Sequence, residues 1–164
     1  MSAILTETSL EHDGRLARHL DAMPPVGDMV GQAAAADLRP RVDDMSDFLE
    51  RLLLPHMDAA ERTLYPELER LLQNRHSMAP MRRDHDEIRQ LIAGISVIRQ
   101  HLDASALDIA ESSALRRLIF RLFAMLKVHL AEERLYLSII EQGASEEELV
   151  RLAAAMEHSG ITAF

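Results

Sequence analysis

Hydrophobic and polar residues follow one another with the period of an α-helix along most of this chain, and nothing in it alternates like a strand. Four long amphipathic segments are separated by short breaks rich in proline, glycine or polar residues. A shorter amphipathic segment follows the fourth one. The pattern therefore predicts an all-α protein, an antiparallel up-down four-helix bundle with a short extra helix at the C-terminus.

Capping residues and prolines set the expected helix boundaries. The first helix opens at the capping box Thr8-Ser9-Leu10-Glu11 and ends before Pro24 and Pro25. A kink is expected at Pro55, inside the second helix, and Gly143 ends the fourth. The expected helices after the first span about residues 40–72, 80–102, 110–142 and 145–158. We expect residues 1–164 to form one domain, with the bundle over about 8–142.

Histidines recur in this chain at a regular spacing. The stretch HMDAAERTLYPEL begins at His56, and the similar stretch HLAEERLYLSII begins at His129. The first helix contains His12 between two acidic residues, as the third contains His85, and both histidines of the first half recur 73 residues later. Two helical hairpins packed with approximate two-fold symmetry would bring these four imidazoles to the bundle axis. Helical bundles build their metal sites there.

The apolar stripe of the fourth helix predicts a buried carboxylate. Leucines and a methionine lie 3, 4, 7, 11 and 14 positions before His129, so its ring points into the core. Glu133 follows four positions later, only about 40° away on a regular helix. A buried carboxylate needs a partner, and a cation shared with His129 would supply one.

The second helix departs from this pattern by one residue. The position four after His56 is Ala60, and Glu61 comes next, about 140° from His56 on a regular helix. The apolar residues that follow are nevertheless in phase with Glu61, so the stripe slips between His56 and Glu61. We therefore predict a π-bulge, or a kink next to Pro55, that turns Glu61 toward the core. The alternative for Glu61 is an exposed glutamate paired with an arginine.

Composition and charge exclude several classes of function. Cysteine is absent, which excludes disulfides, thiolate metal sites and iron–sulfur clusters. The net charge of −9, spread along the chain, argues against a nucleic-acid partner. No apolar run approaches the roughly 18 residues of a membrane span, and the N-terminus does not resemble a signal peptide. We therefore expect a cytoplasmic protein with no membrane partner.

These residues resemble the hemerythrin-like family, the HHE cation-binding proteins, from about Leu10 to Gln142. The most specific pieces are Pro55-His56 with Glu61 to Pro66, then Asp84-His85-Asp86, and His129 to Arg134. The resemblance implies a four-helix bundle that holds non-haem iron, often an oxo-bridged pair. It makes imidazole ligands of four histidines and carboxylate ligands of two glutamates, the second of them only if the slip is real: His12, His56, His85, His129, Glu133 and Glu61.

Two departures from the family pattern bear on the site. Ala60 replaces the usual glutamate, which leaves a mononuclear, asymmetric or degenerate site open. Met81 replaces a histidine of the oxygen carriers, which argues against a dedicated oxygen carrier. His19 lies two turns beyond His12 on the same face and is an alternative to it. Tyr65 is better interpreted as a core residue than as a hydrogen-bond donor to a metal-binding side chain.

The cofactor implied is iron, two Fe ions with an oxo or hydroxo bridge, although nitrogen and oxygen donors also suit manganese and zinc. Three functions follow. The favoured one is a di-iron protein that binds, senses or buffers O2, NO, peroxide or iron. The second is a di-iron oxidoreductase that consumes peroxide or NO, so whether the protein is an enzyme is left open. The third is a metal-free helical interaction protein with a degenerate site. The sequence indicates no particular protein partner.

Overall fold

The computed structural model describes residues 16–104 and 106–158, and the structural statements below concern these residues. They are helical, with no strand among them. A helical segment at 16–21 precedes α2, and the second bundle helix consists of five consecutive elements, two of them π-helices (η). The elements are α2 (Met23–Met29), α3 (Ala35–Phe48), η1 (Leu49–Leu53), α4 (Leu54–Ala59), η2 (Ala60–Leu64), α5 (Tyr65–Leu71), α6 (Ala79–Ala104), α7 (Ile109–Gly143) and α8 (Glu146–His158).

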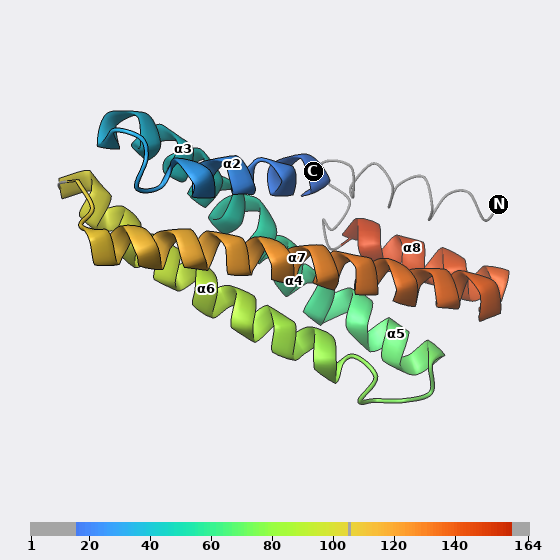
Figure 1. The fold of residues 1–164 in the computed structure, drawn as a ribbon. Coiled ribbons are helices and arrows are strands. Elements are labelled where there is room, and N and C mark those ends of the chain that lie inside the picture. The colour runs from blue at the N-terminus through green and yellow to red at the C-terminus, as the bar shows by residue number, and fades with distance from the viewer. Residues whose placement is uncertain (1–15, 105, 159–164) are drawn as a thin grey trace.

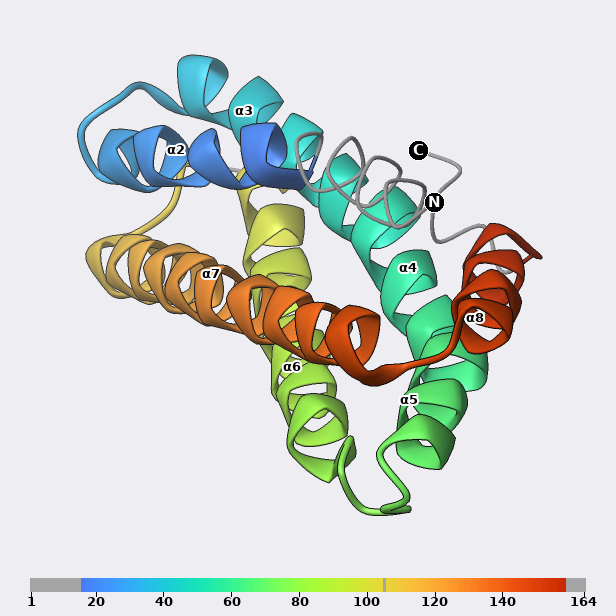
Figure 2. The same cartoon turned by 90° about the vertical axis from the view of Figure 1, so that its right-hand side faces the viewer.

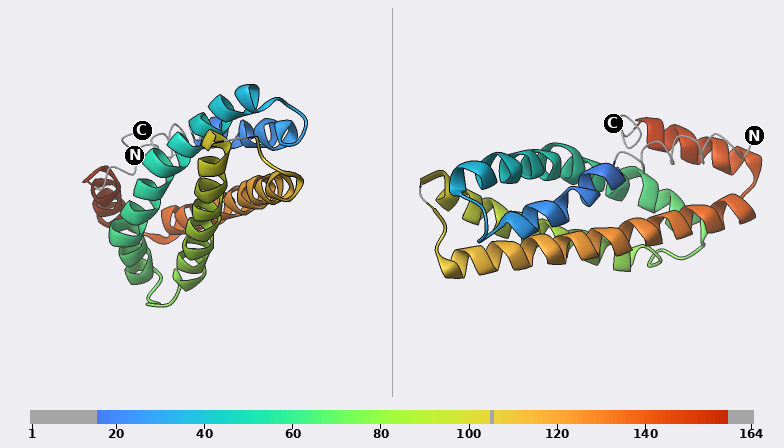
Figure 3. Two further views of the ribbon diagram at one scale, coloured as in Figure 1. Left: turned by 90° about the vertical axis from the view of Figure 1, so that its left-hand side faces the viewer. Right: turned by 45° about the horizontal axis from the view of Figure 1, so that its top comes forward.

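The helices run alternately in opposite directions, which confirms the predicted up-down bundle (Figure 1). Helix α2 packs on α7 and α3, and α6 also packs on both α7 and α3. Figure 2 and Figure 3 show the extra helix α8 turned back beside the second helix, where it contacts η2. The predicted C-terminal helix therefore covers the part of the bundle that contains η2.

The structure agrees with one predicted boundary and contradicts another. The first helical segment ends at residue 21, before Pro24 as predicted, but after a turn at Ala22 the helix α2, which was not predicted, starts at Met23 with Pro24 in its first turn and continues to Met29. A proline there loses nothing, because first-turn N–H groups have no partner inside the helix. The second helix begins at Ala35 rather than near Pro40, which lies inside α3.

The predicted π-bulge is confirmed. The π-helix η2 covers Ala60–Leu64, between His56 and the apolar residues in phase with Glu61. A second π-helix, η1, was not predicted. Both π-helices lie close to His56, as π-bulges often do at functional sites.

Two apolar clusters fill the core, and the histidines lie where they meet. Along α6, Met81 belongs to one cluster and Ile88 to the other, with His85 between them. Along α7, Leu130 and Ile140 belong to different clusters, with Glu133 between them. The buried polar side chains of the described residues are Ser46, His56, His85, His129 and Glu133.

Candidate metal centre

Three helices bring four of the predicted ligands into the core. His56 comes from α4, His85 from α6, and His129 and Glu133 from α7. Each is less than one-tenth exposed, and Glu133 is the most exposed of them at 7%. Each lies on the apolar stripe of its helix, so the packing that buries the stripe buries the donor as well. The sixth predicted ligand, His12, lies outside the described residues.

Two of the imidazoles face each other. The Nε2 atoms of His85 and His129 are 3.0 Å apart, and their rings are tilted by 53°. The hydroxyl of Tyr65 donates to the same Nε2 of His85 at 3.1 Å. Burial, followed by the negative charges of Glu133 and Glu61, holds the pKa of Tyr65 well above its usual range, so its hydroxyl keeps the proton that it donates.

The third imidazole meets the buried carboxylate. Nε2 of His56 is 3.8 Å from Oε2 of Glu133, too far for a good hydrogen bond but close enough for electrostatic attraction. The other oxygen, Oε1, is buried and accepts no hydrogen bond from the described residues. Burial alone would raise the pKa of Glu133, but the imidazole of His56, followed by His129 and His85, lowers it to about 2. The core therefore contains an ionised carboxylate with one oxygen unsatisfied, which a cation would satisfy.

Glu61 lies on the other side of His85. Its Oε1 accepts a hydrogen bond from Nδ1 of His85 at 2.7 Å, and Nη2 of Arg89 donates to the same oxygen at 3.0 Å. The side chain is 28% exposed. The sequence offered two roles for Glu61, a core carboxylate or an arginine-paired surface residue, and the structure shows features of both. It does not bring Glu61 to the side of the ring where His85, His129 and Tyr65 meet.

The protonation state of His85 follows from these contacts. Burial, followed by the positive charge that His129 can carry, lowers the pKa of His85 to about 4, and the hydrogen bond to Glu61 opposes the shift only in part. His85 is therefore neutral near pH 7. A carboxylate can only accept, so the single ring proton is on Nδ1. Nε2 therefore carries the lone pair that accepts the hydrogen bond from Tyr65, and a bound cation would take the place of that hydrogen bond.

Sequence reasoning missed two contributors. Oδ2 of Asp84 lies 3.6 Å from Nδ1 of His129, which has no hydrogen-bond partner among the described residues. Arg89 binds Glu61 from the next turn of α6. The sequence could have indicated Arg89, because it follows His85 by four residues and therefore lies on the same face of α6. Asp84 was noted only for its place in the repeat.

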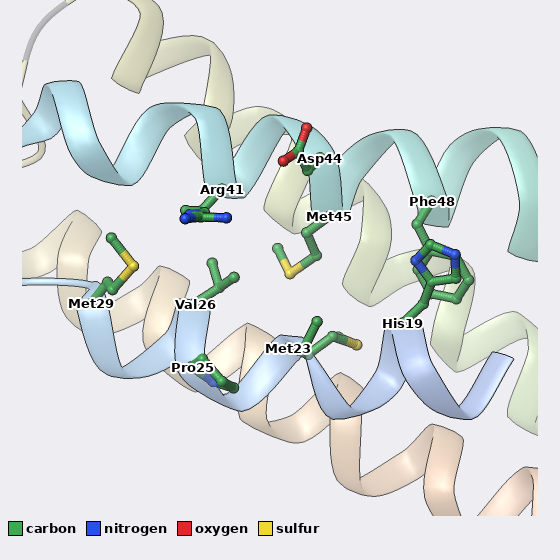
Figure 4. Close-up of a pocket in the computed structure, with 10 residues that line it drawn as sticks. His19, Met23, Pro25, Val26, Met29, Arg41, Asp44, Met45 and Phe48 are labelled. Atoms are coloured by element: carbon green, nitrogen blue, oxygen red, sulfur yellow. The ribbon is translucent and has the colours of Figure 1, made fainter. Parts of the chain in front are cut away.

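The remaining histidines lie elsewhere. His19 is exposed and stacks on Phe48 with ring centroids 4.5 Å apart. It lines a cavity of about 360 Å³ between α2 and α3, with Met23 and Met45 on its walls (Figure 4). His76 and His101 are exposed.

The donors fit a transition-metal ion with nitrogen and oxygen ligands. Among the described residues, no three His, Asp or Glu side chains already surround a single point. The distance between the Nε2 atoms of His85 and His129 nevertheless suits two ligands of one ion. Two nitrogen ligands, each about 2.1 Å from one ion and at right angles, would be about 3.0 Å apart, and the two Nε2 atoms are 3.0 Å apart. Together with the unsatisfied oxygen of Glu133, this geometry suits a bound cation.

Comparison with known proteins agrees with this chemistry. The family model for the hemerythrin HHE cation-binding domain matches residues 11–140. The chain therefore belongs to the hemerythrin HHE cation-binding family, and a cation-binding helical protein is what its fold and buried donors define. Searches among curated proteins and among solved structures gave no match.

Proposed function

We propose that this protein binds iron through His56, His85, His129 and Glu133, with His12 as a fourth imidazole, and that it binds, senses or buffers a small ligand such as O2, NO or peroxide. The observation that carries the proposal is the carboxylate of Glu133, buried among three imidazoles with one oxygen unsatisfied. Such a group is costly in a protein core unless a cation compensates its charge. Iron fits a mixed imidazole and carboxylate donor set, and the family binds cations.

We propose a pair of iron ions as the loaded state. When bound, iron supplies a redox couple and an open coordination position for a small ligand. Three side chains of this protein supply the groups that would surround the iron. Neutral His85 presents the lone pair of Nε2, Glu133 supplies negative charge, and Tyr65 supplies a hydrogen-bond donor within the core. The apolar clusters on either side exclude water, which strengthens these electrostatic interactions.

Elemental analysis tests the proposal directly. Protein purified without oxygen should contain about two iron atoms per chain, and its absorption spectrum should change in air as iron(III) forms. Glu133→Ala should lose most of this metal. Glu132→Ala is the matched control, because Glu132 is the preceding residue of α7 and is exposed. Equal metal contents in the two variants, or a wild-type protein that takes up no metal, would refute the proposal.

Turnover separates this function from catalysis. A change of the spectrum with O2 or NO, without consumption of peroxide, supports binding or sensing, whereas catalytic loss of peroxide would indicate an enzyme.

None of the described helices has the length and apolar character needed to cross a membrane.

A further inference from the structure

The position of Glu61 behind His85 differs from that of a metal ligand. Its Oε1 contacts Nδ1 of His85, while Nε2 of the same ring faces His129 and Tyr65. Nδ1 and Nε2 point away from each other across an imidazole ring. A carboxylate on Nδ1 therefore acts on a bound ion through the ring.

Helix register explains this position. Ala60, fully buried, occupies the place four residues after His56. The π-helix η2 then widens the next turn, so Glu61 faces α6 and reaches His85. The extra residue brings a carboxylate toward the core, but to the outer nitrogen of a histidine from another helix.

An arginine holds Glu61 in this position. Nη2 of Arg89 donates to Oε1 of Glu61 at 3.0 Å and to Oδ1 of Asp58 at 2.7 Å, so one guanidinium bridges two carboxylates of the second helix. Because Arg89 comes from α6, one turn after His85, the same helix supplies the imidazole and the clamp for its partner. The bridge restricts Glu61 to the side of the ring that carries Nδ1.

We infer that Glu61 is a positioning residue for His85 and not a metal ligand. It holds the imidazole as the Nδ1–H tautomer, so that Nε2 keeps its lone pair on the side of His129 and Tyr65, where a cation would bind. Partners of this kind fix the orientation and basicity of a liganding histidine, and their loss typically weakens metal binding about 10- to 100-fold. The inference rests on the proposed metal binding only for its effect on affinity, because the tautomer exists without metal.

Three variants of the full chain test the inference. Glu61→Gln retains an oxygen that can accept from Nδ1–H, Glu61→Ala removes it, and Glu67→Ala is the control on the same helix, where Glu67 pairs with Arg70 away from the histidines. The first measurement is the tautomer of His85 in metal-free protein, by long-range nitrogen–proton NMR correlation of isotope-labelled histidine. We expect Nδ1–H in the wild type, in Glu61→Gln and in Glu67→Ala, and loss of this single tautomer in Glu61→Ala.

The second measurement is iron(II) affinity of the same proteins, compared with Glu133→Gln. We expect Glu61→Gln to remain within a few-fold of the wild type and Glu61→Ala to bind on the order of 10- to 100-fold more weakly. Loss of iron from Glu61→Gln as complete as from Glu133→Gln would make Glu61 a ligand and overturn the inference, as would an Nε2–H tautomer in wild-type protein. If the wild type binds no iron, the proposed function fails, and the tautomer spectra alone decide the role of Glu61.

Discussion

Mild acid should destabilise the metal-free protein through His85. Burial, followed by the nearby charge of His129, lowers the pKa of this imidazole from 6.5 to about 4. Below pH 6.5 the unfolded chain therefore binds a proton that the folded protein does not, and the free energy of unfolding decreases as the pH falls. At about 1.4 kcal/mol per pH unit, this single group accounts for a loss of about 3 kcal/mol when the pH falls from 6.5 to 4.

The pH range separates His85 from the buried carboxylate. Glu133, whose pKa is lowered to about 2, stabilises the fold above its unfolded pKa of 4.5, and this contribution is lost only as the pH falls below that value. Between about pH 6.5 and pH 5, therefore, Glu133 does not change the free energy of unfolding, and the buried imidazole does.

Urea unfolding with a chelator present, measured from about pH 7 to pH 4, provides the assay. The free energy of unfolding of wild-type protein should decrease more steeply with acid than that of His85→Gln, and the two curves should converge by about 3 kcal/mol over this range. His76→Gln, which changes an exposed histidine, should parallel the wild type. Parallel curves for wild type and His85→Gln would refute the reasoning, because they would show that burial does not disfavour the charged form of His85.

Further predictions concern metal and packing. Glu133→Ala should lose more metal than Glu61→Ala by elemental analysis, since only Glu133 faces the imidazoles from a regular helix; equal retention would contradict this. Iron(II) at 100 times its dissociation constant should add about 2.7 kcal/mol to the free energy of unfolding, and a chelator should reverse the gain. Gly27→Ala should cost about 1–3 kcal/mol in urea unfolding, because its Cβ would lie 2.8 Å from the Phe120 ring. Gly143→Ala, with open space around it, should not.

The helices were predictable because their periodicity continues over many turns. The errors came where one local rule was taken alone. Pro24 was interpreted as a stop, but a proline also suits the first turn of a new helix, and only the packing of α2 on α7 and α3 decides between these roles. The start of the second helix was predicted too late for a related reason. The alanines before Pro40 favour a helix, but they do not mark the residue at which it begins.

The site was predictable to the extent that apolar stripes report burial. The stripe of the fourth helix placed His129 and Glu133 in the core, and the repeat placed His85 beside them. The slip between His56 and Glu61 predicted η2, because the apolar positions change phase there. The other π-helix left no such mark. Leu52, Leu53 and Leu54 are all apolar, so an extra residue among them does not change the pattern of hydrophobic positions.

The partner of Glu61 could not be predicted in the same way. Its position depends on side-chain torsions and on Arg89, which another helix supplies. Periodicity along one helix indicates which face a carboxylate occupies. It contains no information about which nitrogen of a facing imidazole that carboxylate meets.

The two halves of the candidate centre differ in stiffness. His129 and Glu133 are fixed four residues apart on α7, a continuous α-helix of 35 residues. His56 belongs to a short α-helical segment bounded on both sides by π-helices, whose wider turns depart from regular α-helical packing. Any adjustment of the donors around an ion therefore falls mainly on the second helix, while α7 acts as the fixed reference. We therefore expect metal loading to move the second helix more than α7.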